Sequence, residues 1–176
     1  MKNFIQMNYF KKITMAVLFM AIPLFTLSCS DDDDDNGTSD KNIVEIAQQT
    51  PDLSTLVGAL VATGLDDALS GPGPYTVFAP TNAAFDKVDD DILNNIIANP
   101  ALLTSLLQYH VVSGDVMSSD LTNGPVQTLL SGQTIDVDIS NGVTLNGSSN
   151  VTSADIDASN GVIHIIDEVL FPEDFY

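Results

Sequence analysis

The spacing of apolar residues changes its period once along this chain, near residue 110. Before that point they recur every three or four positions, as in "DLSTLVGALVATGL" at 52–65 and "LLTSLLQYH" at 102–110, a pattern typical of amphipathic helices. After it the chain consists of short β-branched segments separated by glycine or Asn-Gly, such as "QTIDVDIS" at 133–140, a pattern typical of strands and turns. Consecutive helices followed by consecutive strands predict an α+β domain rather than a repeated strand–helix–strand unit.

Each helical stretch is expected to bury one apolar face. In 52–65 this face repeats at helical spacing, and Gly64 stands where a helix commonly ends. In the stretch that begins at Asp89, an acidic start suits the positive end of a helix dipole. The two predicted faces are Leu53, Leu56, Val57, Leu60 and Val61, and Ile92, Leu93, Ile96 and Ile97.

A strand-to-helix corner lies within the helical part of the chain, at "YTVFAPTNAAF" (75–85). Its first residues are apolar, aromatic and β-branched, which predicts a buried strand with Phe78 in the core. A proline then ends the strand, and Thr81 or Asn82 can cap the helix that follows. No catalytic side chain accompanies the corner, which favours the core of a binding module over an active site.

Charge is distributed unevenly along the sequence. All five basic residues are lysines, and three of them precede residue 28. The two remaining lysines and all 24 acidic residues give residues 29–176 a formal charge of −22. Such a surface repels phosphate groups, so we expect no nucleic-acid partner. The lack of arginine in the sequence also excludes guanidinium clamps for phosphate or carboxylate ligands.

The N-terminal segment has the features of a secretory signal peptide. Three lysines precede an apolar run of 15 residues at 13–27. The run is shorter than the ~20 residues that span a bilayer, and Pro23 interrupts it. We therefore predict that residues 1–28 are a signal peptide and take no part in the fold.

The single cysteine of the sequence, Cys29, follows this segment in the stretch "TLSC". The stretch resembles the lipobox of bacterial lipoproteins, in which a cysteine after a small residue becomes the lipidated first residue. It departs from that pattern in having Thr26 where leucine is usual. Lipidation of Cys29 would attach the protein to a membrane. The alternative is ordinary signal cleavage with an incidental cysteine.

An acidic tether follows, with five adjacent aspartates in "SDDDDDNGTSD" (30–40). Mutual repulsion keeps such a run extended and solvated, and we assign the tether to residues 29–41. It resembles the acidic stretch after the lipidated cysteine of surface-exported lipoproteins in Bacteroidetes. That resemblance implies an outer-membrane anchor with the domain on the cell surface. The alternative is a simple spacer, with the domain on the periplasmic face.

Two stretches, "DVDISNG" (136–142) and "DIDASNG" (155–161), share the pattern Asp-x-Asp-x-Ser-Asn-Gly. Alternating oxygen ligands of this kind open calcium-binding loops. The glycine falls one place late, however, and position twelve is Gly147 or Ile166, where such a loop needs glutamate. We therefore favour two strands that each enter a type I′ Asn-Gly hairpin turn, and we expect no metal site.

The two histidines, His110 and His164, are the candidates for acid–base or zinc chemistry. They are 54 residues apart with no second ligand at short spacing, so a zinc site is not expected. The sequence also lacks a Gly-x-Ser-x-Gly nucleophile elbow, and it has no tryptophan to stack on a sugar ring. We expect both histidines to be core residues with hydrogen-bond partners, and we expect no catalytic residue and no cofactor.

Three stretches, in this order, resemble the motifs of fasciclin (FAS1) domains. "YTVFAPTNAAF" (75–85) resembles the first box, "LLQYHVV" (106–112) the Tyr-His motif and "NGVIHIIDEVLFP" (160–172) the second box. The resemblance covers residues 42–172, which we take as the domain, with 173–176 as a C-terminal tail. It implies a FAS1-like fold, a bundle of short helices against a wedge-shaped β-sandwich. The matched positions, whose role is mainly structural, are Phe78, Thr81, Asn82, Tyr109, His110, Asn160, Gly161, His164 and Asp167.

The family resemblance implies extracellular adhesion through protein or polysaccharide contacts, without catalysis. Together with a lipid on Cys29, it predicts a surface-anchored, single-domain binding protein that is not an enzyme. A structural or accessory lipoprotein within an outer-membrane complex is the alternative. A hydrolase is a further alternative, which would need polar side chains that converge in a pocket.

Overall fold

A computed structural model of the chain describes residues 40–173 and 175. The predicted signal peptide (1–28), the predicted lipidation site Cys29 and residues 29–39 of the predicted tether lie outside the described residues. The helices are α1 (Ile43–Gln49), the 3-10 helix η1 (Pro51–Leu53), α2 (Ser54–Thr63), α3 (Leu65–Leu69), α4 (Asn82–Phe85), α5 (Asp90–Ala98) and α6 (Pro100–Tyr109). The strands are β1 (Tyr75–Pro80), β2 (Val111–Ser113), β3 (Gly124–Gln127), β4 (Thr134–Asp138), β5 (Thr144–Leu145), β6 (Ser149–Ala158) and β7 (Gly161–Ile166).

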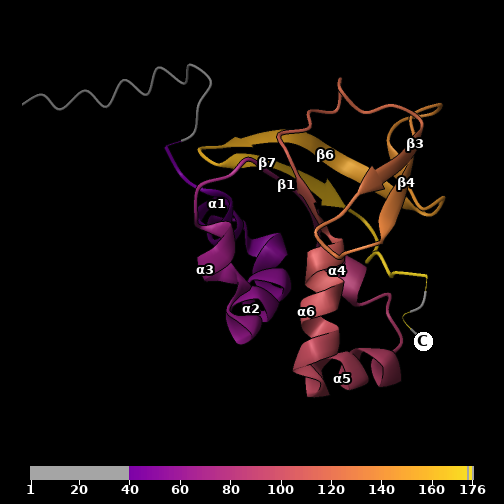
Figure 1. Cartoon of the computed structure of the whole chain (residues 1–176). Helices are drawn as coiled ribbons and strands as arrows, with labels where there is room; N and C mark the ends of the chain where they lie inside the picture. Colours follow the sequence, from indigo (N-terminus) through magenta and orange to yellow (C-terminus); the bar gives the residue numbers. More distant parts are fainter. Residues whose placement is uncertain (1–39, 174, 176) are drawn as a thin grey trace, which may run out of the picture. The chain divides into compact units, whose positions relative to one another are not determined.

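The α+β class is confirmed, and the change of period near residue 110 marks the boundary between its helices and strands. Helix α6 ends at Tyr109 and β2 begins at Val111. Figure 1 shows the helices gathered below the strands. Strand β1 departs from this division of the sequence. It comes from the helical half of the chain but is inserted between β2 and β7 in the sheet. This strand therefore joins the two halves of the sequence.

The strands form a seven-stranded sheet in the order β2-β1-β7-β6-β5-β4-β3. Strand β1 is antiparallel to β2 and parallel to β7, with Phe78 opposite His164. At the other end of the order, Thr128 next to β3 bridges Val112 of β2. The sheet thus folds over until its two outer strands meet, which produces the sandwich that the family resemblance implies.

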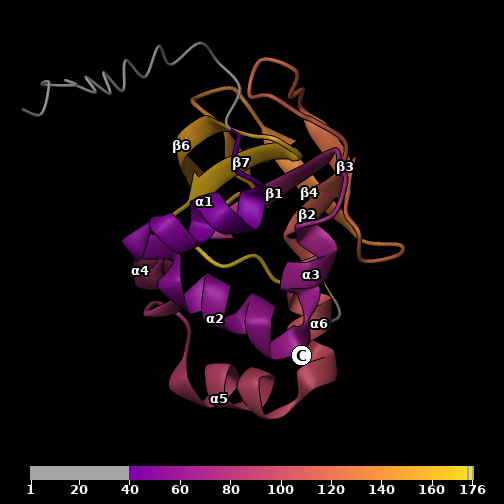
Figure 2. The ribbon, with the colours of Figure 1, turned by 90° about the vertical axis from the view of Figure 1, so that its left-hand side faces the viewer.

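Two hydrophobic cores use opposite faces of β1 and β7, because side chains alternate along a strand. Val77 and Ile163 face the helices and pack with buried leucines of α2 and α6. Phe78 and Ile166 point to the inside of the folded sheet, where they pack with residues that include Ile135 of β4. Figure 2 shows α1 beside β1 and β7, with α2 below it. The central strands are therefore covered on both faces.

The predicted apolar faces of α2 and α5 are each too wide. Val61 and Ile97 are 56% and 60% exposed, whereas Leu60 and Ile96 beside them are buried. Consecutive residues are about 100° apart around a helix, so a neighbour of the buried residue points to solvent when the core covers only one side. The sequence shows that these residues are apolar, but the width of the covered side depends on the neighbouring helices.

The predicted type I′ Asn-Gly turns are wrong, although both hairpins are present. Strand pairs β4–β5 and β6–β7 are antiparallel, but at 141–142 and 160–161 only the glycine has a positive φ. Two consecutive positive φ values, 51° and 71°, occur instead at Asn146-Gly147, between β5 and β6. The β4–β5 loop is too long for a two-residue turn. The β6–β7 loop has two residues, but they are Ser159 and Asn160, because Gly161 already belongs to β7.

Candidate functional site

The first motif box joins the end of β1 to two helices. Thr81 caps α4, since its hydroxyl accepts a hydrogen bond from Ala84 N at 3.2 Å. The Asn82 side chain reaches η1 and α2, where its oxygen accepts from Thr55 N at 2.9 Å and its nitrogen donates to Pro51 O at 3.0 Å. Because the residue that precedes α2 provides no side-chain cap, Asn82 satisfies this helix end from a distant part of the chain.

Tyr109 of the Tyr-His motif ties α6 to the strands. Its hydroxyl donates to Thr134 O at 2.9 Å and accepts from Asn146 Nδ2, also at 2.9 Å. Burial raises the pKa of the Tyr109 phenol, the bond from Asn146 opposes this rise, and the charge of Glu173 adds to it. The phenol therefore stays protonated and acts as a structural donor.

His110 has a hydrogen-bond partner on each ring nitrogen. Its Nδ1 lies 2.8 Å from Leu106 O, and its Nε2 lies 3.0 Å from Leu170 N. Because Leu170 N can only donate, Nε2 is the acceptor and Nδ1 carries the proton. Burial lowers the pKa of His110 from 6.5 to about 4, against the opposing effect of the bond to Leu106 O. The ring is thus neutral near pH 7 and connects α6 to the C-terminal segment.

Asn160 and Gly161 of the second box lie where the β6–β7 hairpin meets the helices. The Asn160 side chain accepts from Ile43 N at 3.0 Å and donates to Leu69 O at 2.7 Å, which links α1 to the end of α3. Gly161 has a φ of 149°, and a Cβ at this position would lie 1.8 Å from Tyr75 O. The close approach of β1 therefore requires glycine here.

Ser118, Asp155 and His164 lie together, a combination that invites comparison with a hydrolase triad. The Ser118 hydroxyl, however, donates to the Asp155 carboxylate at 2.5 Å rather than to the imidazole. The His164 ring accepts from Asp155 N at 3.2 Å and donates to Val116 O at 2.8 Å. It is fully buried and stacks on Phe78, with ring centroids 5.5 Å apart. The serine hydroxyl is therefore not hydrogen-bonded to the imidazole, as the nucleophile of such a triad would be.

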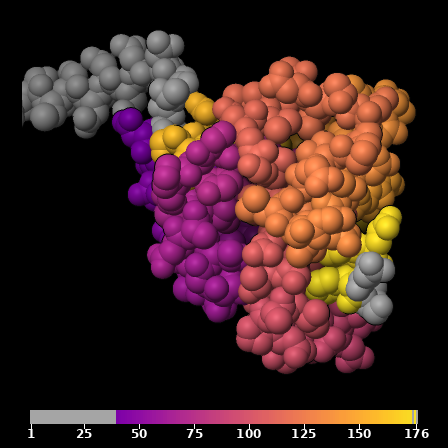
Figure 3. Space-filling model, viewed as in Figure 1, coloured from indigo at the N-terminus to yellow at the C-terminus, as the bar shows by residue number. Residues whose placement is uncertain are grey.

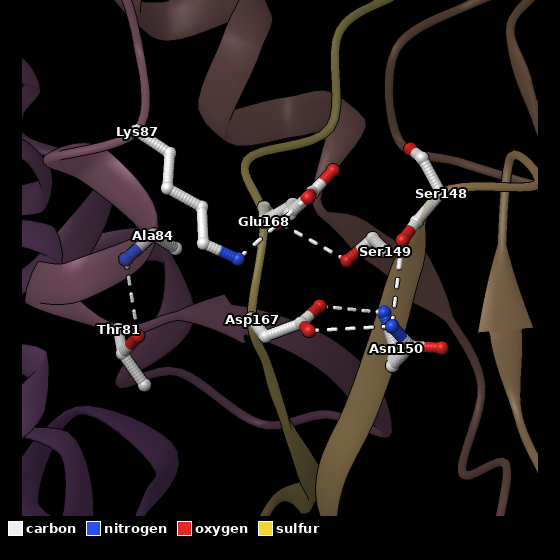
Figure 4. Close-up of polar contacts among 8 residues, drawn as sticks. All are labelled: Thr81, Ala84, Lys87, Ser148, Ser149, Asn150, Asp167 and Glu168. Carbon is white, nitrogen blue, oxygen red and sulfur yellow. Dashed lines mark hydrogen bonds and ion pairs between the residues drawn. The ribbon is translucent and has the colours of Figure 1, made fainter.

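Asp167, the last matched position, clamps the chain beyond β7 onto β6. Its carboxylate accepts from Asn150 N at 2.7 Å and from Asn150 Nδ2 at 3.2 Å, as Figure 4 shows. Partial burial opposes ionisation, but the two bonds from Asn150 and the charge of Lys87 hold the pKa of Asp167 below its usual value. The carboxylate is therefore ionised at neutral pH and fixed in place.

A cleft of about 330 Å³ lies next to this clamp. It is formed by the segment from α4 to α5, the turn before β6 and the chain after β7, and Lys87 and Glu168 line it. In the space-filling view, the yellow C-terminal segment lies between the orange strands above and the pink helical segment below (Figure 3). The sequence patterns do not predict this cleft. A signal that points to it is Lys87 itself, one of two lysines after residue 28.

Comparison with known proteins identifies the family. The Fasciclin domain model matches residues 51–172. The chain belongs to the fasciclin family. This fasciclin protein is 41% identical over 132 residues to protein sll1483 of Synechocystis sp., covering 74% of this chain and 73% of that relative. It is 36% identical over 137 residues to the transforming growth factor-beta-induced protein ig-h3 of Sus scrofa, covering 77% of this chain and 20% of the relative.

The fold of this fasciclin protein is similar to that of a FAS1 domain pair from the insect cell adhesion molecule fasciclin I. The TM-score is 0.65 at 18% sequence identity, and the match covers 78% of this chain and 53% of that structure. At this level of identity the likeness shows the fold alone. It supports the helix-and-sandwich arrangement that the three motifs imply.

The motif residues of this fasciclin domain occupy separate junctions of the fold. The side chain of Asn82 links α4 to the start of α2, that of His110 links α6 to the C-terminal segment, and that of Asn160 links α1 to α3. Within residues 40–173 and 175, no group of three or more His, Cys, Asp or Glu side chains could hold a metal ion. In the same described part of the chain, no helix is both long and apolar enough to cross a membrane.

Proposed function

We propose that this fasciclin protein is a non-catalytic binding module, anchored to the outer membrane through a lipid on Cys29, that contacts an extracellular protein or polysaccharide on the cell surface. The observation that carries the proposal is that the motif side chains form hydrogen bonds within the domain. Asn82, His110, Asn160 and His164 all bind backbone groups of the domain itself. They hold the fold together, which leaves the surface to meet a partner.

The charge of the surface indicates which partners are suited to it. Two lysines and 24 acidic residues follow residue 28, so the protein has a strongly negative field at neutral pH. Such a field attracts basic patches on proteins and repels nucleic acids. An acidic polysaccharide would need divalent cations to bridge the two negative surfaces. Basic proteins and neutral or cation-bridged glycans are therefore the partner classes.

Binding to a basic protein is expected to weaken as salt rises from about 0.05 to 0.5 M, because the Debye length shortens from over 10 Å to a few ångströms. The full chain, held in a non-ionic detergent, would be tested against a glycan array and used to capture surface proteins, with each positive partner titrated at both salt concentrations. Salt-independent capture would contradict an electrostatic contact.

A comparison of cells with and without the gene distinguishes adhesion from the role of an accessory envelope lipoprotein. Cells that lack the gene are expected to aggregate and attach less than the parent strain. Normal attachment, no ligand on the arrays and co-purification with an outer-membrane complex would together overturn adhesion and favour an accessory envelope lipoprotein.

Replacement of Cys29 by alanine is expected to release the protein from the membrane fraction. Several acyl chains on one residue anchor a protein stably, at about 0.8 kcal/mol per buried CH₂, and the proposal contains no other durable attachment. The measurement is fractionation of cells followed by immunoblotting. Ser28→Ala, which keeps both a small residue before the cysteine and the cysteine itself, serves as the matched control. Unchanged fractionation of the alanine variant would remove the lipid anchor from the proposal.

The side of the membrane on which the domain lies is tested in the same strains. Protease added to whole cells is expected to degrade the parent protein. After deletion of residues 31–35 the protein should stay in the membrane fraction but become protected, if the acidic run directs export to the surface. Equal degradation of both forms would mean that the run is a spacer.

A further inference from the structure

A weak ion pair occupies the cleft between the α4–α5 segment and the chain after β7. Lys87 Nζ lies 3.6 Å from Glu168 Oε1, and the two side chains are 52% and 41% exposed. This separation exceeds the roughly 2.7–3.2 Å of an N–H···O hydrogen bond. Exposed ion pairs of this kind contribute little to stability. The cleft thus holds an ammonium group that another cation can displace at small cost.

The Glu168 carboxylate projects from a fixed backbone (Figure 4). The carbonyl oxygen of Glu168 accepts from Ser149 Oγ at 3.1 Å, and Ser149 is fully buried. On one side, Asp167 is held by its bonds to β6, and on the other, Leu170 N donates to His110 at 3.0 Å. A backbone held at three neighbouring residues loses little entropy when a ligand binds.

The remainder of the cleft suits the aliphatic part of a long side chain. Ile92, Val169 and Phe171 line it, and Val169 is nearly buried. Methylene groups of basic side chains pack on such apolar surface while the charged head stays at the polar rim. The volume of about 330 Å³ is close to the lower end of the ~300–1,000 Å³ range of small-ligand sites. One long side chain therefore fills this cleft better than an extended ligand.

The electrostatic environment favours a cation over an anion. Asp89, an exposed acidic residue before α5, also lines the cleft, and the Asp167 carboxylate lies near enough for the charge of Lys87 to lower its pKa. Within the described residues, the Glu168 carboxylate is engaged only by the long contact with Lys87. Its two oxygens can therefore accept further hydrogen bonds.

We propose that the cleft binds an arginine side chain of a partner protein, with Glu168 accepting two N–H bonds from the guanidinium and Lys87 moving aside. Arginine suits the cleft better than lysine, because its planar fork matches both carboxylate oxygens. This inference rests on the proposed function only in taking the partner to be a protein.

The test uses the full chain in a non-ionic detergent, with its isoleucine methyl groups labelled for NMR. The probe is the blocked peptide acetyl-Gly-Arg-Gly-amide, and the control peptide carries citrulline, which has nearly the same shape but no charge. The Ile92 methyl signal, assigned with Ile92→Val, is expected to shift saturably with the arginine peptide. The citrulline peptide should bind at least about fivefold more weakly, since it cannot form charge-assisted bonds.

Matched variants separate the cleft from the general negative field. Glu168→Gln should weaken arginine binding about fivefold or more, while Asp120→Asn, which removes an equal charge from an exposed loop, should change it by less than about twofold. Lys87→Gln should strengthen binding more than Lys41→Gln, because only Lys87 competes for Glu168. Thermal melting checks the fold of each variant, and the melting temperature of Glu168→Gln should stay close to that of the parent.

Equal binding of the citrulline peptide, or equal weakening by Glu168→Gln and Asp120→Asn, would overturn the arginine site. Failure of the site and failure of the proposed function give different results. If the parent chain captures a basic protein and Glu168→Gln captures it equally well, the cleft is not the contact and the binding role stands. If no protein or glycan is captured, the binding role fails, and the peptide titration still decides whether the cleft takes arginine.

Discussion

Replacement of Phe78 by alanine is expected to lower the free energy of unfolding by about 3–5 kcal/mol, as large-to-small changes of aromatic core residues do. Phe78 is 1% exposed and lies on the inner face of the folded sheet. Its ring also stacks on His164 at a centroid distance of 5.5 Å and an interplanar angle of 27°. Truncation therefore leaves a cavity beside a buried histidine. The loss is a large part of the typical stability of about 5–15 kcal/mol.

Urea unfolding of the full chain in non-ionic detergent, followed by circular dichroism, measures this effect. The matched control is Ile97→Ala, which truncates an apolar residue that is 60% exposed on α5. Its expected change is within about 0.5 kcal/mol, as for other surface positions. If Phe78→Ala unfolds at the same urea concentration as the parent, the aromatic ring contributes nothing to the core and the assignment of β1 as a buried strand is wrong.

Acidification from pH 7 to about pH 4.5 is expected to lower the stability by about 2–3 kcal/mol through His110. In the folded protein this ring must be neutral, because Nε2 accepts from Leu170 N at 3.0 Å. Protonation would turn Nε2 into a donor that faces another donor, in a fully buried site. Burial accordingly lowers the pKa of His110 from 6.5 to about 4.

The direction of the effect follows from these two pKa values. Between pH 6.5 and about 4, the unfolded chain binds a proton at His110 that the folded chain does not. The stability contribution is therefore complete above pH 6.5 and is lost as the pH falls toward 4. The carboxylates of Asp155 and Asp167 also have lowered pKa values, so their contributions are lost as the pH falls from the ordinary carboxyl range through those lowered values. The two effects occupy different pH windows.

His110→Gln provides the control for this prediction, because glutamine does not titrate. The variant is expected to be less stable than the parent at pH 7 and to change less between pH 7 and pH 4.5. Denaturant unfolding of both proteins at several pH values gives the comparison. Parallel stability curves for parent and variant across this window would show that His110 is not the group that titrates.

The order of helices and strands and the burial of β1 could be predicted from the sequence, because both depend on residues close together in the chain. The period of the apolar residues shows whether a segment is a helix or a strand. The corner at 75–85 carries its own signals, with a run of strand-forming residues followed by the cap at Thr81. Three motifs in order also pointed to the family that the Fasciclin domain match then confirmed.

The tertiary structure decided which distant segments of the chain pair and pack with one another. The sequence places β1 before α4, yet β1 pairs with β2 and β7 from much later in the chain. The partner of Asn82 is the start of α2 rather than its own helix. Val61 belongs to the apolar pattern of α2 but stays exposed, because the core covers only one side of that helix. Long-range partners of this kind leave no periodic signal.

The sequence by itself therefore determined the α+β class, the local caps and the negative charge of this protein. The tertiary structure decided which polar groups form hydrogen bonds within the domain and which remain available to a partner. In the linear chain His110 is a candidate for acid–base chemistry and Asn160 a predicted turn residue, but folding brings backbone donors and acceptors to both. Lys87 and Glu168 are ordinary charges that folding places together at a cleft. The physical reason is that hydrogen bonds and clefts form between segments that only packing brings within reach.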